Sequence, residues 1–260
     1  MIEEKKLKKY SEIALIVVRE ASKFLIANFG PTKNATHKTE HHFGIEDDIK
    51  LNDFYEKKLK RLTPEISLYT EEGEKNLDSD LVWVVDPIDG TSNYRVGNPF
   101  YGTQIFLLYR NDPLISIISA PSLKQTFRAI KGKGSFLNNN KIKVTPLVNL
   151  KESLVSIGKG TKYSDNLWYG GILKNMLEQV RTFRHFGSAG LELAYTASGK
   201  IDIYINKGAH FYDYTPGVLI VREAGGVVTD FNGNEWNINE DSLIASNRTL
   251  NEESVKIFKR

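Results

Sequence analysis

Apolar and charged positions alternate at helical spacing in the first part of the chain. Apolar residues recur every three or four positions from Leu7 to Phe24, with Lys and Glu between them. This period predicts an amphipathic helix, which Gly30-Pro31 ends. The next stretch, about 32–48, is polar, rich in His and without a clear period, so we expect a mobile loop there. A second helix is predicted over about 53–62.

Further along the chain, short apolar runs replace the helical period. Strands are predicted at 66–70, 81–85, 101–109, 114–120 and 126–130, with Gly and Asn supplying the turns between the later ones. Beyond about residue 150, strands and helices alternate. The predicted strands are 154–157, 180–183, 202–205 and 242–245, and the predicted helices are 165–177, 188–198, one after Asp213 and one at the C-terminus.

Antiparallel strands followed by alternation predict a layered α/β (α+β) fold. We expect one domain over 1–260, with subdomains of about 1–148 and 149–260. The 260 residues are 40% hydrophobic, which is enough to bury a substantial core.

The composition excludes several classes of protein. Lys and Arg exceed Asp and Glu by only 35 to 32, without a basic stripe, so we expect no nucleic-acid partner. The chain has no cysteine, so any metal must bind oxygen or imidazole ligands. The early apolar run Ile13–Val18 is too short to span a membrane, and the charged residues at the start are unlike a signal peptide. A cytoplasmic protein without a membrane partner is therefore expected.

The clearest chemical signal lies in the run Trp83–Asn93. An apolar strand brings Asp86 to its C-terminal end, and Pro87 turns the chain so that Asp89 returns close to Asp86. Two carboxylates held together in a partly buried place repel each other unless they are protonated or bind a cation. Gly90-Thr91 opens a predicted helix whose first amides favour an anion. Metal-binding acids next to an anion-binding helix start are typical of a phosphate site.

Each acidic element also has a plainer interpretation. Asp89-Gly90 is an ordinary turn dipeptide, Asp213 can be a helix N-cap, and Glu71-Glu72 can be a solvated strand edge. Their combination in one chain favours a shared site over three unrelated local features.

Several segments together resemble the successive motifs of the inositol monophosphatase family, in the family's order and spacing. They are Glu71-Glu72-Gly73, Trp83 to Asn93, Gly187-Ser188-Ala189 and Asp213 to Gly226. The resemblance extends from the first helix to Ala245–Arg248, which is nearly the whole chain. It implies an αβαβα sandwich and a Mg²⁺-dependent phosphomonoesterase with two to three ions in each active site.

The resemblance also implies a role for individual residues. The metal ligands implied are Glu71, Asp86, the carbonyl of Ile88, Asp89 and Asp213, with Glu72 just behind them. Gly90, Thr91 and Ser92 are expected to hold the phosphate, and Gly187, Ser188 and Ala189 to face the alcohol part of the substrate. Glu71 and Thr91 are expected to take part in catalysis, by attack of a metal-activated water that Thr91 orients.

The chain departs from the family pattern ahead of the second helix. The family has an Asp there that bonds the threonine, whereas this chain has Asn52, which accepts a hydrogen bond but cannot take a proton. Either the adjacent Asp53 takes this catalytic role through a one-residue shift, or the metals alone activate the water. The polar loop is expected to be flexible, and a second hypothesis is that Lys38 or a histidine approaches the phosphate when the loop closes.

A second departure concerns the substrate. Inositol-specific members carry an acid where this chain has Asn206, which can hydrogen-bond a sugar without adding charge. Inositol monophosphate and fructose 1,6-bisphosphate are therefore both expected substrates, and Arg184 and Lys207 are candidates to contact a second phosphate. The alternatives are 3′-phosphoadenosine 5′-phosphate or another small phosphate ester, and a catalytically silent relative that binds or regulates. A homodimer or homotetramer is expected from the family.

Overall fold

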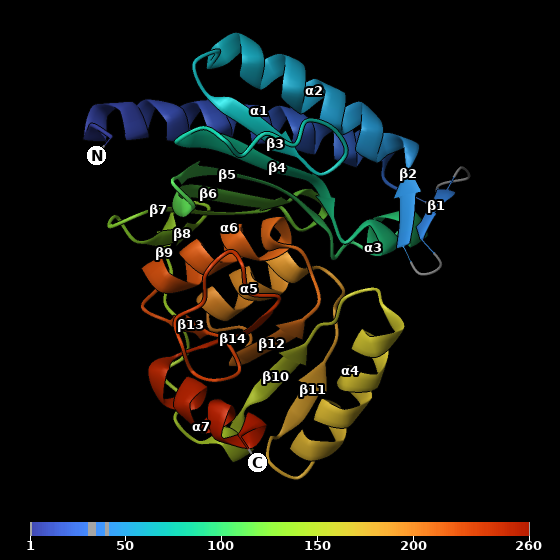
Figure 1. Cartoon of the computed structure of the whole chain (residues 1–260), viewed down its shortest axis with the longest axis vertical. Helices are drawn as coiled ribbons and strands as arrows, with labels where there is room; N and C mark the ends of the chain where they lie inside the picture. The colour runs from blue at the N-terminus through green and yellow to red at the C-terminus, as the bar shows by residue number, and fades with distance from the viewer. Residues whose placement is uncertain (1, 31–34, 40–41, 260) are drawn as a thin grey trace.

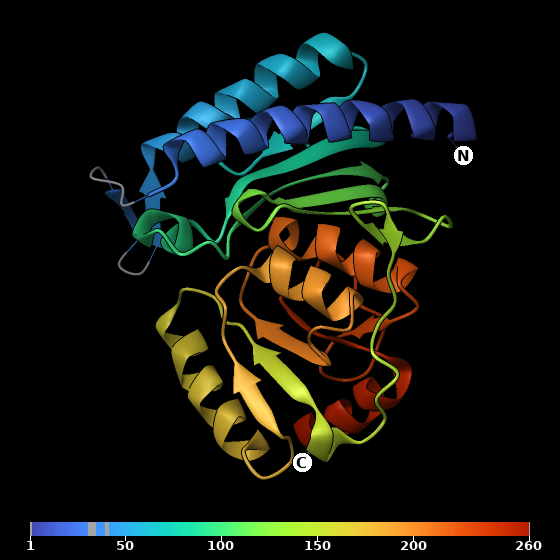
Figure 2. The same ribbon diagram turned by 180° about the vertical axis from the view of Figure 1, so that it is seen from behind.

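The structure, a computed structural model, describes residues 2–30, 35–39 and 42–259. Layers of helix and sheet alternate along its long axis (Figure 1). Helices α1 and α2 form one end, and a first sheet lies against them. Helices α5 and α6 fill the middle, and a second sheet separates them from α4 and α7. The view from behind shows the same order (Figure 2). The predicted αβαβα sandwich is confirmed.

The end layer forms because α1 (Glu4–Asn28) and α2 (Glu46–Leu62) each present an apolar stripe to the first sheet. In α1 the buried stripe includes Ala14, Val17 and Leu25, none of which is exposed. The predicted boundaries of the second helix were wrong, because α2 begins at Glu46 rather than near Asp53. Three acids in its first turn complement the helix dipole and favour this earlier start.

The polar stretch before α2 also differs from the prediction. Within the predicted loop 32–48, strands β1 (Ala35–Thr39) and β2 (His42–Ile45) pair in antiparallel register. These two strands are short and mostly polar, so they lack the alternation of apolar and polar residues that predicts a strand, and the hairpin was not predicted. The side chain of Lys38 lies outside the described part of the structure, and its predicted approach to the phosphate stays a prediction.

The first sheet has seven strands in chain order and brings the acidic motifs to one end. Its strands are β3 (Ser67–Thr70), β4 (Leu81–Asp89), β5 (Gly102–Tyr109), β6 (Asp112–Ala120), β7 (Gln125–Ile130), β8 (Ser135–Leu137) and β9 (Asn140–Lys141). Only the β3–β4 pairing is parallel, and the remaining pairs are antiparallel. The short helix α3 (Thr91–Val96) follows β4 directly.

The second sheet has the order β11-β10-β12-β14-β13. Its strands are β10 (Leu154–Ile157), β11 (Thr182–Arg184), β12 (Ile203–Lys207), β13 (Val227–Thr229) and β14 (Ser242–Ser246). Between the sheets lie α5 (Ala189–Ala197) and α6 (Phe211–Glu223), and on the outer side lie α4 (Tyr163–Met176) and α7 (Arg248–Phe258). Short 3-10 turns occur at Pro121–Leu123 and Leu150–Glu152. The subdomain boundary near residue 148 stays a prediction.

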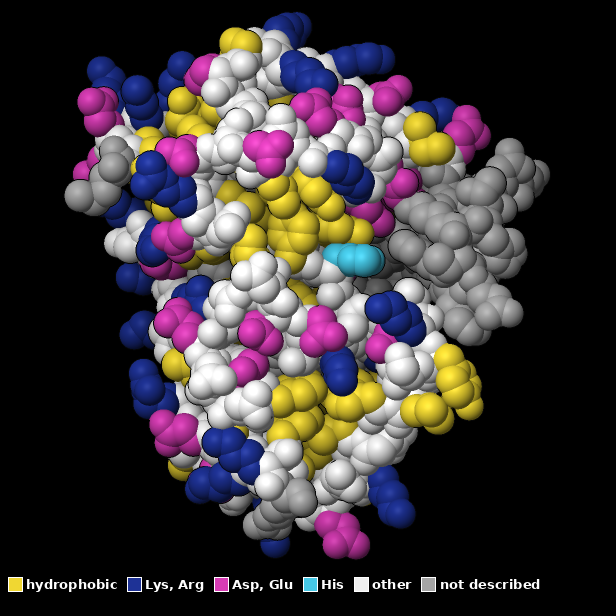
Figure 3. Space-filling view, in the orientation of Figure 1, with side chains coloured by type: hydrophobic (Ala, Val, Ile, Leu, Met, Phe, Trp, Pro, Cys, Tyr) yellow, Lys and Arg dark blue, Asp and Glu magenta, His cyan; other side chains and the backbone are white. Residues whose placement is uncertain are grey.

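The surface mixes both signs of charge. On the face shown in Figure 3, Lys and Arg side chains are interspersed with Asp and Glu rather than gathered into a stripe. Among the described residues, no helix is both long and apolar enough to cross a membrane.

Candidate metal and phosphate site

Strand β4 delivers two acids to the same end of the first sheet. The strand is buried from Val82 to Asp89, which suits its run of Val and Trp side chains. Asp86 pairs with Gln104 on β5 and Asp89 pairs with Gly102, so the register shifts between the two acids. The extra β4 residues bulge at Pro87, as expected for a residue that cannot donate to the ladder. The bulge turns both acids toward one cavity.

That cavity has a volume of about 300 Å³, which is small for a ligand pocket. The predicted metal ligands, the predicted phosphate-binding residues and the predicted alcohol-facing residues all line it: Glu71, Asp86, Ile88, Asp89, Asp213, Gly90, Thr91, Ser92, Gly187, Ser188 and Ala189. Segments far apart in the chain therefore meet at this point, between the end of the first sheet and the loops of the second.

Asp86 is the most enclosed of the four carboxylates. Its side chain is 1% exposed, and Gln104 Nε2 donates to Oδ2 at 2.7 Å. Oδ1 is buried and accepts no hydrogen bond from any described residue. Burial, reinforced by the charges of Glu71, Asp89 and Asp213, raises the pKa of the Asp86 carboxyl well above its ordinary value. An enclosed carboxylate oxygen without a donor is a place where a cation would be stabilised.

Asp89 has the opposite environment, because one of its oxygens is crowded with donors. Ser188 Oγ donates to Oδ2 at 2.6 Å, and the backbone amides of Gly190 and Leu191 donate at 2.9 and 3.3 Å. These amides are the first of α5, so the helix start fixes the carboxylate. Burial raises the pKa of Asp89 to about 6, although these hydrogen bonds oppose the rise.

Asp213 reaches the cavity from α6. It is the third residue of that helix, and His210 N donates to its Oδ2 at 2.7 Å. The plainer interpretation of Asp213 as an N-cap is therefore wrong, since His210 is the N-cap and Asp213 closes the capping box. Burial, with the charges of Glu71 and Asp89, raises the pKa of Asp213 well above its ordinary value.

Glu71 follows β3, and both its backbone amide and its backbone carbonyl are hydrogen-bonded. Its amide donates to Val85 O at 3.1 Å, which continues the β3–β4 ladder. Lys75 Nζ donates to the carbonyls of Thr70 and Glu71 at 2.8 and 2.5 Å, and the same ammonium lies 4.8 Å from the centroid of the Tyr69 ring. This lysine fixes the turn that presents Glu71 and was not found from the sequence.

The donor set fits a hard divalent cation. It consists of carboxylate oxygens and the Ile88 carbonyl, which are the ligands that Mg²⁺ prefers. Burial is the main cause that raises the pKa values of Asp86 and Asp213, and the repulsion from neighbouring acids that adds to it is what a cation relieves. Within the described residues, no three acidic or histidine side chains are already grouped closely enough to hold an ion.

The segment after Asp89 builds the predicted phosphate cradle. Gly90 has φ 84°, and a Cβ there would lie 3.1 Å from Gly187 O and 3.1 Å from Ser188 Cβ. Both the left-handed backbone and the close approach therefore require glycine. Thr91 Oγ1 donates to the carbonyl of Ile88 at 2.9 Å. This bond ties a predicted catalytic hydroxyl to a predicted metal ligand.

One side chain joins the cradle to the opposite wall. Asn93 Nδ2 donates to the carbonyls of Phe100 and Phe186 at 2.8 and 2.6 Å. Phe186 precedes the 187–189 segment, so the two walls of the cavity are fixed relative to each other by an amide.

The opposite wall contains a buried acid that the sequence pattern did not reveal. Glu192 of α5 is 1% exposed. It accepts hydrogen bonds from Ser156 Oγ and from the amides of Phe186 and Ser188, the last two at 3.3 Å each. Burial raises the pKa of the Glu192 carboxyl. This carboxylate holds the 186–188 backbone in place behind the substrate side of the cavity.

Asn206 also lines the cavity, although its amide is largely engaged within the protein. Its Nδ2 donates to the hydroxyl oxygen of Tyr204 at 2.5 Å, and the Tyr214 hydroxyl donates to Asn206 Oδ1 at 2.9 Å. One Nδ2 hydrogen remains for a substrate hydroxyl.

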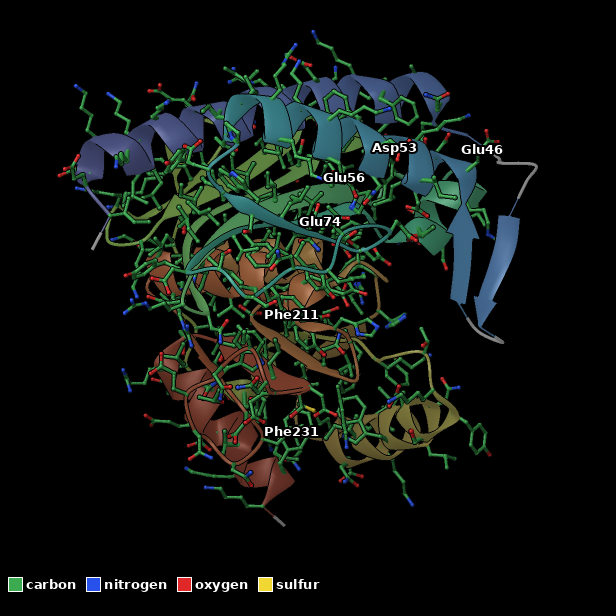
Figure 4. All side chains as sticks on the ribbon, turned by 45° about the horizontal axis from the view of Figure 1, so that its top comes forward. Glu46, Asp53, Glu56, Glu74, Phe211 and Phe231 are labelled. Atoms are coloured by element: carbon green, nitrogen blue, oxygen red, sulfur yellow. The ribbon has the colours of Figure 1, made fainter. Side chains whose placement is uncertain are left out.

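Two predicted residues lie elsewhere and are corrected. Asp53 is exposed on α2 (Figure 4), because it is one position beyond the buried Asn52 and so a third of a turn away. Asn52 Nδ2 donates to Glu56 Oε1 at 3.0 Å. Arg184 is exposed, and its Nη1 donates to Thr182 Oγ1 and Phe183 O at 3.0 and 2.7 Å, away from the cavity.

Among the described Lys and Arg residues, the one that lines the cavity is Lys159, not Arg184 or Lys207. It follows β10 in the segment Gly158-Lys159-Gly160, which has no periodic pattern. Two glycines flanking a lysine are the only signal that could have indicated a tightly packed loop at this place.

Comparisons with known proteins agree with this geometry. Residues 6–260 match the sequence profile of the inositol monophosphatase family. A fructose-1,6-bisphosphatase/inositol-1-monophosphatase of Thermotoga maritima is 29% identical over 253 residues, covering 95% of this chain and 94% of the relative. A Nus factor SuhB of Xylella fastidiosa is 34% identical over 203 residues, covering 78% and 74%. The solved structure of an IMPase from Thermotoga maritima has a TM-score of 0.89 at 29% identity, covering 95% and 96%.

Proposed function

The chain belongs to the inositol monophosphatase family and is a phosphoric monoester hydrolase, and on this premise we propose that it hydrolyses inositol monophosphate, fructose 1,6-bisphosphate or both. The family is generally Mg²⁺-dependent and acts on small phosphate esters. We assign Glu71, Asp86, Asp89, Asp213 and the Ile88 carbonyl to two or three Mg²⁺ ions.

The observation that carries this proposal is the single cavity shared by the four carboxylates and the start of α3. A metal-binding acid cluster and an anion-binding helix start are each unremarkable alone. Placed on one small cavity, they provide ligands for cations on one side and free backbone amides for phosphate oxygens beside them. The buried Oδ1 of Asp86, which lacks a donor among the described residues, adds a specific position for a cation.

The residues of this chain then divide the work of hydrolysis. When bound, Mg²⁺ supplies positive charge that acidifies water and offsets the charge of the phosphoryl group. The hydroxyl hydrogen of Thr91 is directed to Ile88 O, so the oxygen lone pairs of Thr91 are available to accept a hydrogen bond from the attacking water. Thr91 therefore orients the water. Gly90, Thr91 and Ser92 hold the phosphate through their backbone and side chains.

Proton removal does not involve the position next to Asn52. Asn52 is a neutral amide that bonds to Glu56, and Asp53 is exposed on the neighbouring face of α2 and does not line the cavity. Of the two routes that the sequence left open, we favour activation of the water by the metals, with Glu71 among the acids that line the site.

The substrate is proposed from the alcohol side of the cavity. Gly187, Ser188 and Ala189 offer backbone and a small side chain, and Asn206 offers one amide hydrogen without charge. This arrangement suits a polyhydroxylated ring or sugar. The Thermotoga maritima relative, whose name joins fructose-1,6-bisphosphatase and inositol-1-monophosphatase, supports considering both substrates.

The test is phosphate release from inositol 1-phosphate, fructose 1,6-bisphosphate, 3′-phosphoadenosine 5′-phosphate and glycerol phosphate. Each is measured with Mg²⁺ and with EDTA, for wild type and for Asp89→Asn. We expect Mg²⁺-dependent release from the first two substrates, lost in the variant. Release from the adenosine bisphosphate alone would replace the substrate assignment.

A binding role is the second candidate, because several relatives are named Nus factor SuhB. Absence of turnover on every substrate, by a folded protein that binds Mg²⁺, would favour this candidate over the enzyme.

A further inference from the structure

The loop after β10, residues 158–161, is pressed tightly against the second sheet. Gly158 N donates to Ile205 O at 2.8 Å and Gly160 N donates to Lys207 O at 2.7 Å, so the loop extends the β10–β12 ladder. A Cβ on Gly158 would lie 2.3 Å from Asn206 Nδ2, and a Cβ on Gly160 would lie 2.2 Å from Gly208 O. No side chain fits at either position, so the backbone of this loop is fixed.

Lys159 stands between these two glycines and lines the cavity. Its side chain is half-buried, and its ammonium makes one long contact, 3.4 Å to Gly160 O. In the part of the chain that the structure describes, Lys159 forms no salt bridge, although lysines elsewhere pair with acids. A fixed backbone therefore holds at the cavity wall a cation that no described acid pairs with as a salt bridge.

The carboxylates across the cavity are not the counter-charge of Lys159. Glu71, Asp86, Asp89 and Asp213 formally balance two divalent cations, and those cations attract the phosphate that is hydrolysed. Asn206 on the alcohol side of the cavity offers an anion little, since it is neutral and its Oδ1 accepts from Tyr214. An anionic group on the far end of a substrate would find its counter-charge in Lys159.

We infer that Lys159 binds a second anionic group of the substrate, so that the site favours a sugar or polyol carrying two phosphates over one carrying a single phosphate. This inference rests on the proposed function and narrows its substrate class. The phosphate to be hydrolysed lies at the carboxylates, and the second phosphate, which is not hydrolysed, lies at Lys159.

The experiment compares Lys159→Gln, Lys159→Arg and Lys207→Ala with wild type. Lys207 is the matched control, because it meets the same loop through its backbone but does not line the cavity. Phosphate release is measured with fructose 1,6-bisphosphate and with inositol 1-phosphate. For Lys159→Gln we expect KM for the bisphosphate to rise about tenfold or more, as for loss of a charge-assisted hydrogen bond, and kcat/KM for the monophosphate to change less than about twofold. Lys159→Arg should restore most of the loss, and Lys207→Ala should match wild type.

A binding measurement separates this inference from the proposed function. The probe is an analogue of fructose 1,6-bisphosphate with a methylene in place of the C1 ester oxygen, titrated by calorimetry with Mg²⁺ present. If wild type hydrolyses neither substrate but binds the analogue, and Lys159→Gln binds it more weakly, the anion site is supported and the phosphatase is overturned. If wild type hydrolyses both substrates and Lys159→Gln changes kcat/KM equally for the two, or for neither, the anion site is overturned and the phosphatase stands.

Discussion

The two walls of the cavity are built by different means. The wall from the first sheet carries acids on β4 and at the end of β3, and the first turn of α6 adds Asp213. Burial, with the charges of neighbouring acids, raises the pKa values of Asp86 and Asp213. The wall from the second sheet is made of loops fixed by glycines and by the buried Glu192. The first wall holds charge that needs a cation, whereas the second positions neutral groups and one lysine. The residues proposed for hydrolysis therefore lie on the first wall, and those proposed for substrate choice lie on the second.

The largest expected effect comes from breaking the first wall at Asp86. The amide in Asp86→Asn is nearly isosteric but cannot bridge cations, so kcat/KM for phosphate release with Mg²⁺ should fall by about 10³-fold or more. Circular dichroism should show an unchanged fold, because the substitution removes a repelling charge. Activity within tenfold of wild type would contradict the role of this carboxylate.

A smaller effect is expected where the two walls meet. Ser188→Ala removes the 2.6 Å hydrogen bond to Asp89 while leaving the two α5 amides in place. The Mg²⁺ concentration for half-maximal activity should rise about tenfold, as expected for a hydrogen bond to a charged group. Ser122→Ala, a serine bonded to Tyr101 instead, serves as the control. An unchanged Mg²⁺ requirement in Ser188→Ala would show that the second wall does not position this ligand.

The sign of the pH dependence also distinguishes the first wall. In metal-free protein the folded pKa of Asp89 is about 6, above its ordinary value. As the pH rises from about 4 to about 6, the unfolded chain loses this proton first, so the stability of the folded state falls. Melting temperatures in EDTA should decrease across this window, and less steeply for Asp89→Asn. The same slope in both proteins would contradict the raised pKa.

The smallest effect is expected for residues that the sequence wrongly assigned to the site. Asp53→Ala and Arg184→Ala should change kcat/KM by less than about twofold, because both side chains are exposed and outside the cavity. A loss of tenfold in either variant would show that the residue reaches the site during turnover.

These residues also show how far the sequence can lead. Asp86 and Asp89 could be predicted because they lie three residues apart around a proline, and local chemistry alone brings them together. Asp53 could not be excluded, because its exposure depends on where α2 begins, and the predicted start was seven residues late. The helices, strands and layered α/β class followed from the strand and helix periods, which depend on local burial, whereas the αβαβα layer order came from the family resemblance.

The second wall was beyond the reach of such patterns. Glu192 has the spacing of a solvated helix residue, and only tertiary packing of α5 against β10 buries it beside Ser156. Lys159 lies in a loop whose conformation is set by contacts with Gly208 and Asn206, more than forty-five residues later. Long-range contacts of this kind leave no period in the sequence.

The most direct test of the central claim is a calorimetric titration of Mg²⁺ into wild type and Asp86→Asn, after treatment with EDTA. If the carboxylates form the metal site, wild type should bind two or three ions and the variant should lose at least one of them. Identical titrations for the two proteins, or no Mg²⁺ binding by wild type, would contradict the account.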